Sequence, residues 1–190
     1  MCSSDLNGKP YGKENQAMEW VPIKQLVERD FPAANRAIVT AVSLPDSYLI
    51  TPEPGDIELF ITTLEKSLKN GVRLVQLRAK KLDDDQYLTL AKKTSKLCHR
   101  YHARLLINNT PAIVDEVAAD GVHLSSERLM SLYRRPLAND KWVAASCHNM
   151  TELKQACQID VDFVVLSPVL PTASHPGADI LEWAGFKALT

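Results

Sequence analysis

Residues 57–80, IELFITTLEKSLKNGVRLVQLRAK, join one helix to one strand, and this unit decides the fold class. Apolar residues recur at the i, i+3, i+4 spacing of a helix that buries one face: Ile57, Phe60, Ile61, Leu64 and Leu68. Asn70-Gly71 tolerates the left-handed backbone that ends such a helix. Residues 74–78 then form a short apolar strand, and this order is typical of a parallel α/β sheet.

The same alternation continues along the chain. Further strands are expected at 47–51, 104–108, 121–125, 142–148 and 163–168, and further helices from Asp83 onward and over 111–118, 127–133, 151–158 and 181–189. Helices between successive strands indicate a parallel sheet with right-handed crossovers. About six such units with short loops predict an α/β fold, an incomplete TIM-type (β/α)₈ barrel. No GxGxxG follows the first strand, so a dinucleotide-binding fold has little support.

Composition limits the partners. The 190 residues are 45% hydrophobic and carry a net charge of −1 with scattered basic residues, so we expect no nucleic-acid partner. No apolar run is long enough to cross a bilayer, and the four cysteines lack the spacing of a zinc site. Without a secretory segment, these features favour a cytoplasmic protein with reduced thiols and no membrane contact.

The acidic run Asp83-Asp84-Asp85 opens the second helix and allows two interpretations. Acidic side chains at a helix N-terminus accept hydrogen bonds from free backbone N–H groups and suit the helix dipole. A metal site is the alternative. We adopt capping, because it accounts for the run at once.

Polar side chains follow the second strand of the expected sheet. Gln76, Arg78 and Lys80 alternate with apolar neighbours, so period two points all three the same way. The carboxyl ends of parallel strands are where β/α proteins bind ligands. An amide, a guanidinium and an ammonium group together predict a clamp for a phosphate or diphosphate.

Other strand ends add to this edge. The third ends with Asn108 and Asn109, and the fifth with Ser146 and His148. His148 has two open interpretations, a general base facing the pocket or a histidine packed under a loop. The sixth runs into a hydroxyl- and proline-rich loop whose side chains suit a phosphate: Thr172, Ser174 and His175.

Five stretches carry a resemblance to a known family: Val75-Gln76-Leu77-Arg78-Ala79-Lys80, Leu106-Ile107-Asn108-Asn109, Ala119-Asp120-Gly121-Val122-His123-Leu124, Ala145-Ser146-Cys147-His148 and Ser167-Pro168-Val169-Leu170-Pro171-Thr172-Ala173-Ser174-His175. Their order and spacing over about residues 46–190 resemble the thiamine-phosphate synthase/TenI superfamily. The resemblance implies a TIM barrel acting in thiamine biosynthesis. Synthases of this superfamily join a pyrimidine diphosphate to a thiazole phosphate with Mg²⁺, whereas the TenI branch tautomerises the thiazole without a metal.

The resemblance also implies roles for single residues. Those that would hold the pyrimidine diphosphate are Gln76, Arg78, Lys80 and Asn108. Those that would contact its diphosphate and the thiazole phosphate are Ser146, Thr172 and Ser174. His148 falls where TenI-type enzymes have their catalytic histidine.

Three positions depart from the synthase pattern. Asn109 and Arg128 stand where synthases have metal-binding aspartates, and His175 stands in place of a lysine. Since Mg²⁺ prefers carboxylate oxygen, we expect no metal site here and doubt the synthase reaction. Arg128 could instead supply positive charge to a diphosphate. The alternatives are a metal-independent thiazole tautomerase and a non-catalytic regulatory domain that binds thiamine or thiazole phosphates.

The first part of the chain has a different resemblance. It resembles the C-terminal tail of a MutT-type Nudix hydrolase through Gly12-x-Glu14-x-Gln16, Trp20-Val21-Pro22 and Phe31-Pro32-x-Ala34-Asn35. In that family Asn35 would bind the nucleobase. The glutamate-rich Nudix box is absent, so no Nudix activity is expected of this chain.

These resemblances predict a domain plan. Residues 1–6 are expected to be a non-native leader, 7–42 the Nudix tail, 43–47 a linker, and 48–190 a truncated barrel. The parent is expected to be a fusion with an 8-oxo-dGTP diphosphatase, carrying the rest of the Nudix domain and the last two barrel strands. We therefore expect no synthase turnover from this chain alone.

Overall fold

The computed structural model describes residues 11–12, 14, 17–26, 29, 31–32, 35–172 and 180–190. The chain divides into two compact units, residues 1–44 and 45–190, and the division falls inside the expected linker. The described part of the first unit contains two helices, α1 (Ile23–Leu26) and α2 (Arg36–Ser43). The second unit contains the expected sheet.

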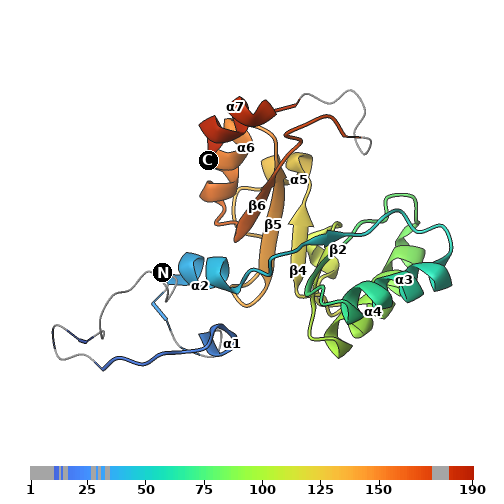
Figure 1. Ribbon diagram of the computed structural model, residues 1–190. Helices are drawn as coiled ribbons and strands as arrows, with labels where there is room; N and C mark the ends of the chain where they lie inside the picture. The colour runs from blue at the N-terminus through green and yellow to red at the C-terminus, as the bar shows by residue number, and fades with distance from the viewer. Residues whose placement is uncertain are drawn as a thin grey trace. The chain divides into compact units, whose positions relative to one another are not determined.

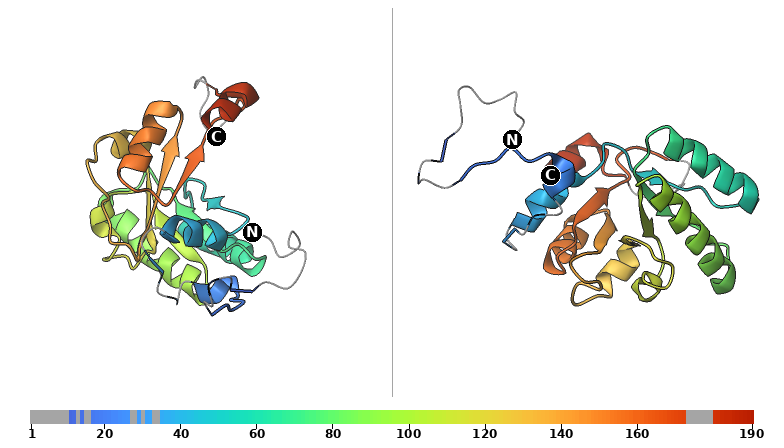
Figure 2. Two further views of the ribbon diagram at one scale, coloured as in Figure 1. Left: turned by 90° about the vertical axis from the view of Figure 1, so that its left-hand side faces the viewer. Right: turned by 90° about the horizontal axis from the view of Figure 1, so that it is seen from below.

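A parallel sheet of six strands forms the second unit (Figure 1). Its strands are β1 (Leu49–Ile50), β2 (Leu74–Leu77), β3 (Arg104–Ile107), β4 (Gly121–Leu124), β5 (Trp142–Cys147) and β6 (Phe163–Leu166). Each strand pairs with the next one along the chain, so the spatial order equals the sequence order. The strands follow an arc, which makes the sheet a half-barrel (Figure 2). All six strands lie where the sequence predicts them.

The helices cover the outer side of this arc. They are α3 (Ile57–Lys69), α4 (Asp84–Arg100), α5 (Ser126–Met130) and α6 (Met150–Gln158), and a further helix, α7 (Glu182–Leu189), ends the described chain without a buried residue. In the right view of Figure 2, α3 to α6 lie around the convex side of the strands. Gly71 has φ 98°, which is the left-handed backbone expected after α3.

One expected helix is wrong. Residues 111–118 form only a 3₁₀ turn, Pro111–Ile113, followed by further turns. Val114 N donates to Pro111 O in an i→i+3 bond, and Ala118 has a φ of 52°. The left-handed backbone of Ala118 ends these turns before β4 begins.

The main core lies between the sheet and the helices. Alternate strand residues point into it, such as Val75 and Leu77 of β2 and Leu105 and Ile107 of β3, all fully buried. The intervening residues face the concave interior of the half-barrel. Period-two alternation therefore assigns every strand side chain either to the helices or to the interior.

The start of α4 confirms the capping interpretation of the acidic run. The Asp83 carboxylate accepts a hydrogen bond from Gln86 N at 2.8 Å, and the Gln86 side chain accepts one from Asp83 N at 3.3 Å. This reciprocal pair is a capping box. Asp84 and Asp85 lie in the first turn, where negative charge is favourable.

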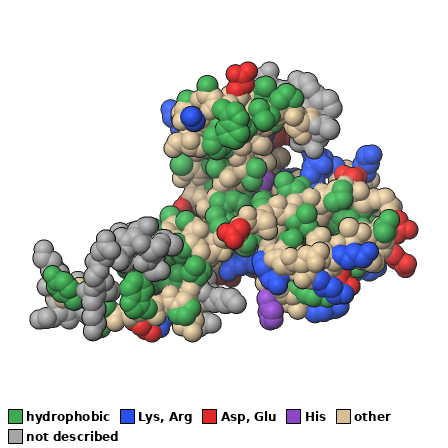
Figure 3. Space-filling model, in the orientation of Figure 1, with side chains coloured by type: hydrophobic (Ala, Val, Ile, Leu, Met, Phe, Trp, Pro, Cys, Tyr) green, Lys and Arg blue, Asp and Glu red, His purple; other side chains and the backbone are tan. Residues whose placement is uncertain are grey.

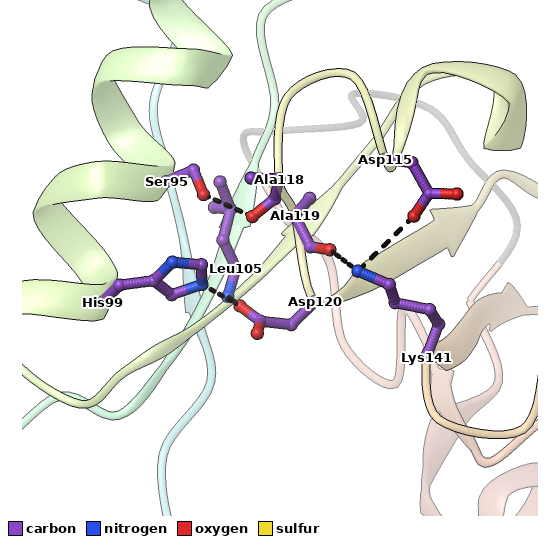
Figure 4. Close-up of polar contacts among 8 residues, drawn as sticks. All are labelled: Ser95, His99, Leu105, Asp115, Ala118, Ala119, Asp120 and Lys141. Atoms are coloured by element: carbon purple, nitrogen blue, oxygen red, sulfur yellow. Dashed lines mark hydrogen bonds and ion pairs between the residues drawn. The ribbon is translucent and has the colours of Figure 1, made fainter.

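Asp120 fixes the entry to β4 at the amino edge of the sheet (Figure 4). Its Oδ2 accepts hydrogen bonds from Leu105 N at 2.7 Å, and it lies 3.0 Å from His99 Nε2. Lys141 Nζ donates to Ala119 O at 2.8 Å. These contacts tie the strand start to both neighbouring strands, and so determine which residue of β4 faces which residue of β3 and β5.

Charges of both signs are interspersed over α3 and α4 (Figure 3). Glu65 pairs with Lys69 at 3.6 Å, and Lys92 pairs with Glu116 at 2.9 Å. Exposed pairs of this kind contribute little to stability, but they prevent a large patch of one sign. Throughout the part of the chain that the structure describes, no helix is long and apolar enough to cross a bilayer.

Candidate functional site

The candidate site lies at the carboxyl ends of the strands. Because all six strands are parallel, their carboxyl ends meet at one edge of the half-barrel (Figure 1). Eight of the residues expected at the site follow or end strands β2 to β5: Gln76, Arg78, Lys80, Asn108, Asn109, Arg128, Ser146 and His148. The fold thus brings side chains far apart in sequence to one edge.

The end of β2 shows the predicted alternation. Leu77 and Ala79 pack into the core on the helix side, while Arg78 is half-buried and Lys80 is exposed. Gln76 is only 4% exposed, and its Oε1 is buried with no hydrogen-bond partner among the described residues. A buried amide oxygen without a partner costs free energy, and a bound ligand that donates to it would recover that cost.

The loop after β1 holds this strand end in place. Thr51 Oγ1 accepts a hydrogen bond from Arg78 N at 3.0 Å. The Glu53 carboxylate accepts from Lys80 N at 3.1 Å and from Lys81 N at 2.7 Å. Thr51 and Glu53 were not among the residues predicted for the site. The sequence could have indicated them, since a hydroxyl and a carboxylate side chain follow the first strand just as polar side chains follow the other strands.

The ends of β3 and β4 converge on a buried phenol. Burial raises the pKa of the Tyr87 hydroxyl, and the positive charge of Arg128 and a hydrogen bond with the Asn109 side chain act against that rise. Asn109 Oδ1 also accepts a hydrogen bond from Thr110 N at 2.6 Å. Asn108 Nδ2 donates to His123 O at 2.8 Å. The Tyr87 hydroxyl itself donates to Leu77 O at 3.4 Å, which ties α4 to the end of β2.

These residues do not fit a magnesium ion. Among the described residues there is no group of three histidine, cysteine, aspartate or glutamate side chains that could hold a metal. The amide oxygen of Asn109 already accepts a backbone hydrogen bond, and the guanidinium of Arg128 repels a cation. The positive charges at this edge are those of the Arg78, Lys80 and Arg128 side chains.

The end of β5 carries Ser146 and His148. Ser146 is half-buried and lies 2.9 Å from His123 Nε2. His148 is exposed rather than packed under a loop, and its backbone N donates to Glu152 Oε2 at 2.7 Å. No described residue makes a hydrogen bond with its imidazole. Of the two interpretations of His148, the exposed position fits a side chain that is available to a ligand.

The remaining predicted residues lie elsewhere or are not described. Thr172 is half-buried after β6, and Ser174 and His175 lie outside the described residues. Asn35 belongs to the first unit, where it precedes α2 and its backbone N donates to Pro32 O at 2.8 Å. Its assignment to a nucleobase stays a prediction.

Sequence reasoning also missed two interior side chains. Tyr48 lies just before β1, and its hydroxyl is 3.0 Å from Nδ1 of His123 on β4. His123 is 1% exposed, and burial lowers its pKa to about 4. The strand alternation could have revealed His123. Val122 and Leu124 both pack on the helix side, so the residue between them faces the interior.

Burial of this histidine predicts a pH-dependent stability. In the folded state the pKa of His123 is about 4, below the ordinary value of 6.5, so the unfolded chain binds more protons between these values. Stability is therefore lost as the pH falls through this window. By linkage, we expect the contribution of His123 to the free energy of unfolding to fall by about 2 kcal/mol between pH 7.5 and pH 5.

Urea unfolding at both pH values measures this loss. Carboxylates titrate at the lower end of the same range, so the comparison is with His123→Gln, which cannot titrate. We expect the difference in pH dependence between the two proteins to be about 2 kcal/mol. Equal pH dependence in both would mean that His123 is protonated as readily in the folded protein as in the unfolded chain.

Comparison with known proteins finds relatives for the second unit. A family model described as thiamine monophosphate synthase matches residues 47–190. A protein of Aquifex aeolicus named "Putative thiamine-phosphate synthase 2" is 41% identical over 148 residues, which are 78% of this chain and 78% of that protein. The thiamine-phosphate synthase of Thermosynechococcus vestitus is 40% identical over 143 residues, 72% of this chain but only 40% of that longer protein.

A solved structure agrees with the observed fold. The thiamine phosphate pyrophosphorylase of Pyrococcus furiosus matches with a TM-score of 0.58 at 19% identity, over 75% of this chain and 67% of that one. This likeness shows that the half-barrel follows the same fold. The family match begins at residue 47, so it does not extend to the segment with the Nudix resemblance, which stays a prediction.

Proposed function

This chain belongs to the thiamine monophosphate synthase family, and from that membership we propose that the carboxyl edge of its sheet binds the phosphorylated pyrimidine and thiazole compounds joined in thiamine biosynthesis. Relatives at 40–41% identity are named as thiamine-phosphate synthases, which supports a role in the same pathway. The observation that carries the proposal is the end of β2, where a buried amide oxygen has no partner among the described residues and two cationic residues follow at alternate positions.

The three side chains have separate tasks in this proposal. Gln76 offers its unpartnered Oε1 to a donor on the pyrimidine, and the interior position keeps water from competing. Arg78 and Lys80 bind the diphosphate through charge-assisted hydrogen bonds. Thr51 and Glu53 fix the backbone that carries both cations, so their side chains start from a set position.

Joining the two compounds requires the diphosphate to leave as the new C–N bond forms. Cationic groups stabilise the negative charge that develops on a departing diphosphate. Arg78, Lys80 and Arg128 can supply that charge without an acidic cluster for a metal. We therefore propose that ligand binding at this edge does not depend on Mg²⁺.

Calorimetry with the pyrimidine diphosphate tests both parts of the proposal. We expect Arg78→Gln to weaken binding by at least about tenfold, the size of one lost charge-assisted hydrogen bond. The control is Arg134→Gln, an exposed arginine on the loop after α5, which should bind like wild type. We expect similar affinity in Mg²⁺ and in EDTA. Absence of binding by the wild-type chain would refute the site, and binding only in Mg²⁺ would refute the metal-independent part.

A second candidate function is a metal-independent thiazole tautomerase. It is favoured by the exposed imidazole of His148 at the end of β5, together with the absence of an acidic metal cluster among the described residues. A thiazole phosphate isomerisation assay compares His148→Asn with His102→Asn, an exposed histidine at φ 53° where asparagine is tolerated. Loss of turnover in the first variant alone would support the tautomerase. Binding of the thiazole phosphate by the wild-type chain without isomerisation would instead support a regulatory domain.

A further inference from the structure

A chain of three side chains crosses the concave interior beneath the candidate site. The Tyr48 hydroxyl lies 3.0 Å from His123 Nδ1, and His123 Nε2 lies 2.9 Å from Ser146 Oγ. Tyr48 immediately precedes β1, His123 lies in β4 and Ser146 in β5. Both ring nitrogens of the buried histidine therefore have a hydroxyl partner.

The two hydrogen bonds that join these side chains can point in either of two directions. A neutral imidazole has one N–H and one acceptor nitrogen, and each hydroxyl can donate or accept. In one direction Tyr48 donates to Nδ1 and Nε2–H donates to Ser146. In the other, Ser146 donates to Nε2 and Nδ1–H donates to Tyr48.

The second direction leaves a phenol hydrogen without an acceptor. Among the described residues, the only hydrogen-bond partner of the Tyr48 hydroxyl is His123, and burial raises the pKa of this hydroxyl above its ordinary value. The Tyr48 side chain is half-buried, and its ring packs against the rings of His123 and Phe163. A phenol hydrogen left unpaired in this packed interior is costly. In the first direction the hydrogen left over belongs to Ser146, which is half-buried at the ligand edge and can donate to whatever binds there.

We infer that Tyr48 and His123 are positioning residues that make Ser146 a hydrogen-bond donor toward the ligand edge. The lone-pair side of Ser146 Oγ is occupied by His123 Nε2–H, so its own O–H is directed to an acceptor. The ligand group that fits is one with acceptor oxygens only, such as an ionised phosphate. This inference rests on the proposed function for the identity of the ligand, but the direction of the hydrogen bonds among the three side chains does not depend on it.

The direction can be measured without a ligand. Long-range ¹H–¹⁵N NMR of the full chain reports which ring nitrogen of His123 carries the proton. We expect the Nε2–H form in wild type and in Ser146→Ala, because Tyr48 still donates to Nδ1. We expect Tyr48→Phe to lose this preference and to show Nδ1–H as a substantial fraction. Tyr101→Phe, which removes a phenol bonded to Glu65 on the outer surface, is the control and should leave His123 unchanged.

Binding of inorganic pyrophosphate, followed by calorimetry, measures the consequence for the ligand. We expect Ser146→Ala to weaken binding about tenfold and Tyr48→Phe by a smaller factor, about threefold. Nδ1–H in the wild-type protein would overturn the inference whether or not any variant folds. Equal pyrophosphate affinity in Ser146→Ala and wild type would overturn its ligand arm.

The two proposals can fail separately. Suppose that His123 carries the Nε2–H in the wild-type protein and shifts toward Nδ1–H in Tyr48→Phe, but that the wild-type protein binds no phosphate compound. The proposed function then fails, and the inferred direction of the hydrogen bonds stands. If the pyrimidine diphosphate binds and His123 is in the Nδ1–H form, the function stands and the positioning role fails.

Discussion

The Gly121→Ala variant is expected to lose about 4 kcal/mol or more of unfolding free energy, which exceeds the ~1–3 kcal/mol of ordinary overpacking. A Cβ added at Gly121 would lie 1.9 Å from Trp142 O and 2.9 Å from Leu106 Cδ2. Gly121 opens β4 and is the register partner of Trp142 in β5 and of Leu106 in β3. The obstacle on one side is a backbone carbonyl, which cannot rotate away as a side chain can. The strands must therefore separate.

Urea unfolding and the yield of soluble protein measure this effect. Gly55→Ala is the control, because nothing lies within 4 Å of a Cβ at that glycine, and it should stay within about 0.5 kcal/mol of wild type. Wild-type stability in Gly121→Ala would contradict this prediction, because it would mean that β4 and β5 move apart without cost in free energy.

The second large effect is expected at Arg135. Its guanidinium donates to Asp162 Oδ2 at 2.6 Å, to Lys141 O at 2.7 Å and to Asp160 O. The two charged side chains are only 11% and 4% exposed. Asp162 Oδ2 also accepts from Val143 N at 2.7 Å, so this buried pair ties the starts of β5 and β6 to the loop after α5.

Truncation to Arg135→Ala removes the guanidinium that both donates to and pairs with the buried carboxylate of Asp162. Breaking a buried pair from one side costs about 3–5 kcal/mol, and we expect a loss of this size in thermal or urea unfolding. Arg134→Ala removes the adjacent, exposed arginine and should cost less than about 0.5 kcal/mol. A loss below about 1 kcal/mol at Arg135 would mean that water replaces the guanidinium at Asp162.

Much of the fold could be predicted from local patterns. The apolar stripe of α3 and the alternation at Leu77, Arg78 and Ala79 are written within a few residues of sequence, because helices and strands have fixed periods. The order of the strands followed as well, since short crossovers place successive parallel strands side by side. The helix expected over 111–118 was wrong, because the apolar pattern of this segment is met by a 3₁₀ turn and further turns that bury Val114 and Val117.

The candidate site divides in the same way. The position of Gln76, Asn108 and Ser146 at the carboxyl ends of strands could be predicted from the sequence, while their role in binding stays a prediction. The chain from Tyr48 through His123 to Ser146 could not, because its members are separated by 75 and 23 positions. Their contact depends on how strongly the sheet curls, which no single segment encodes.

The sequence by itself therefore determined the α/β class, the strand order and the edge at which polar side chains gather, because each follows from periodicity and short connections. Only the tertiary structure decided which side chains meet. Gly121 is required because the carbonyl of Trp142 lies against it, and Arg135 matters because Asp162 is buried beside it. The physical reason is that register and curvature are set by the packing of all six strands together, and contacts across strands depend on distances of a few ångströms.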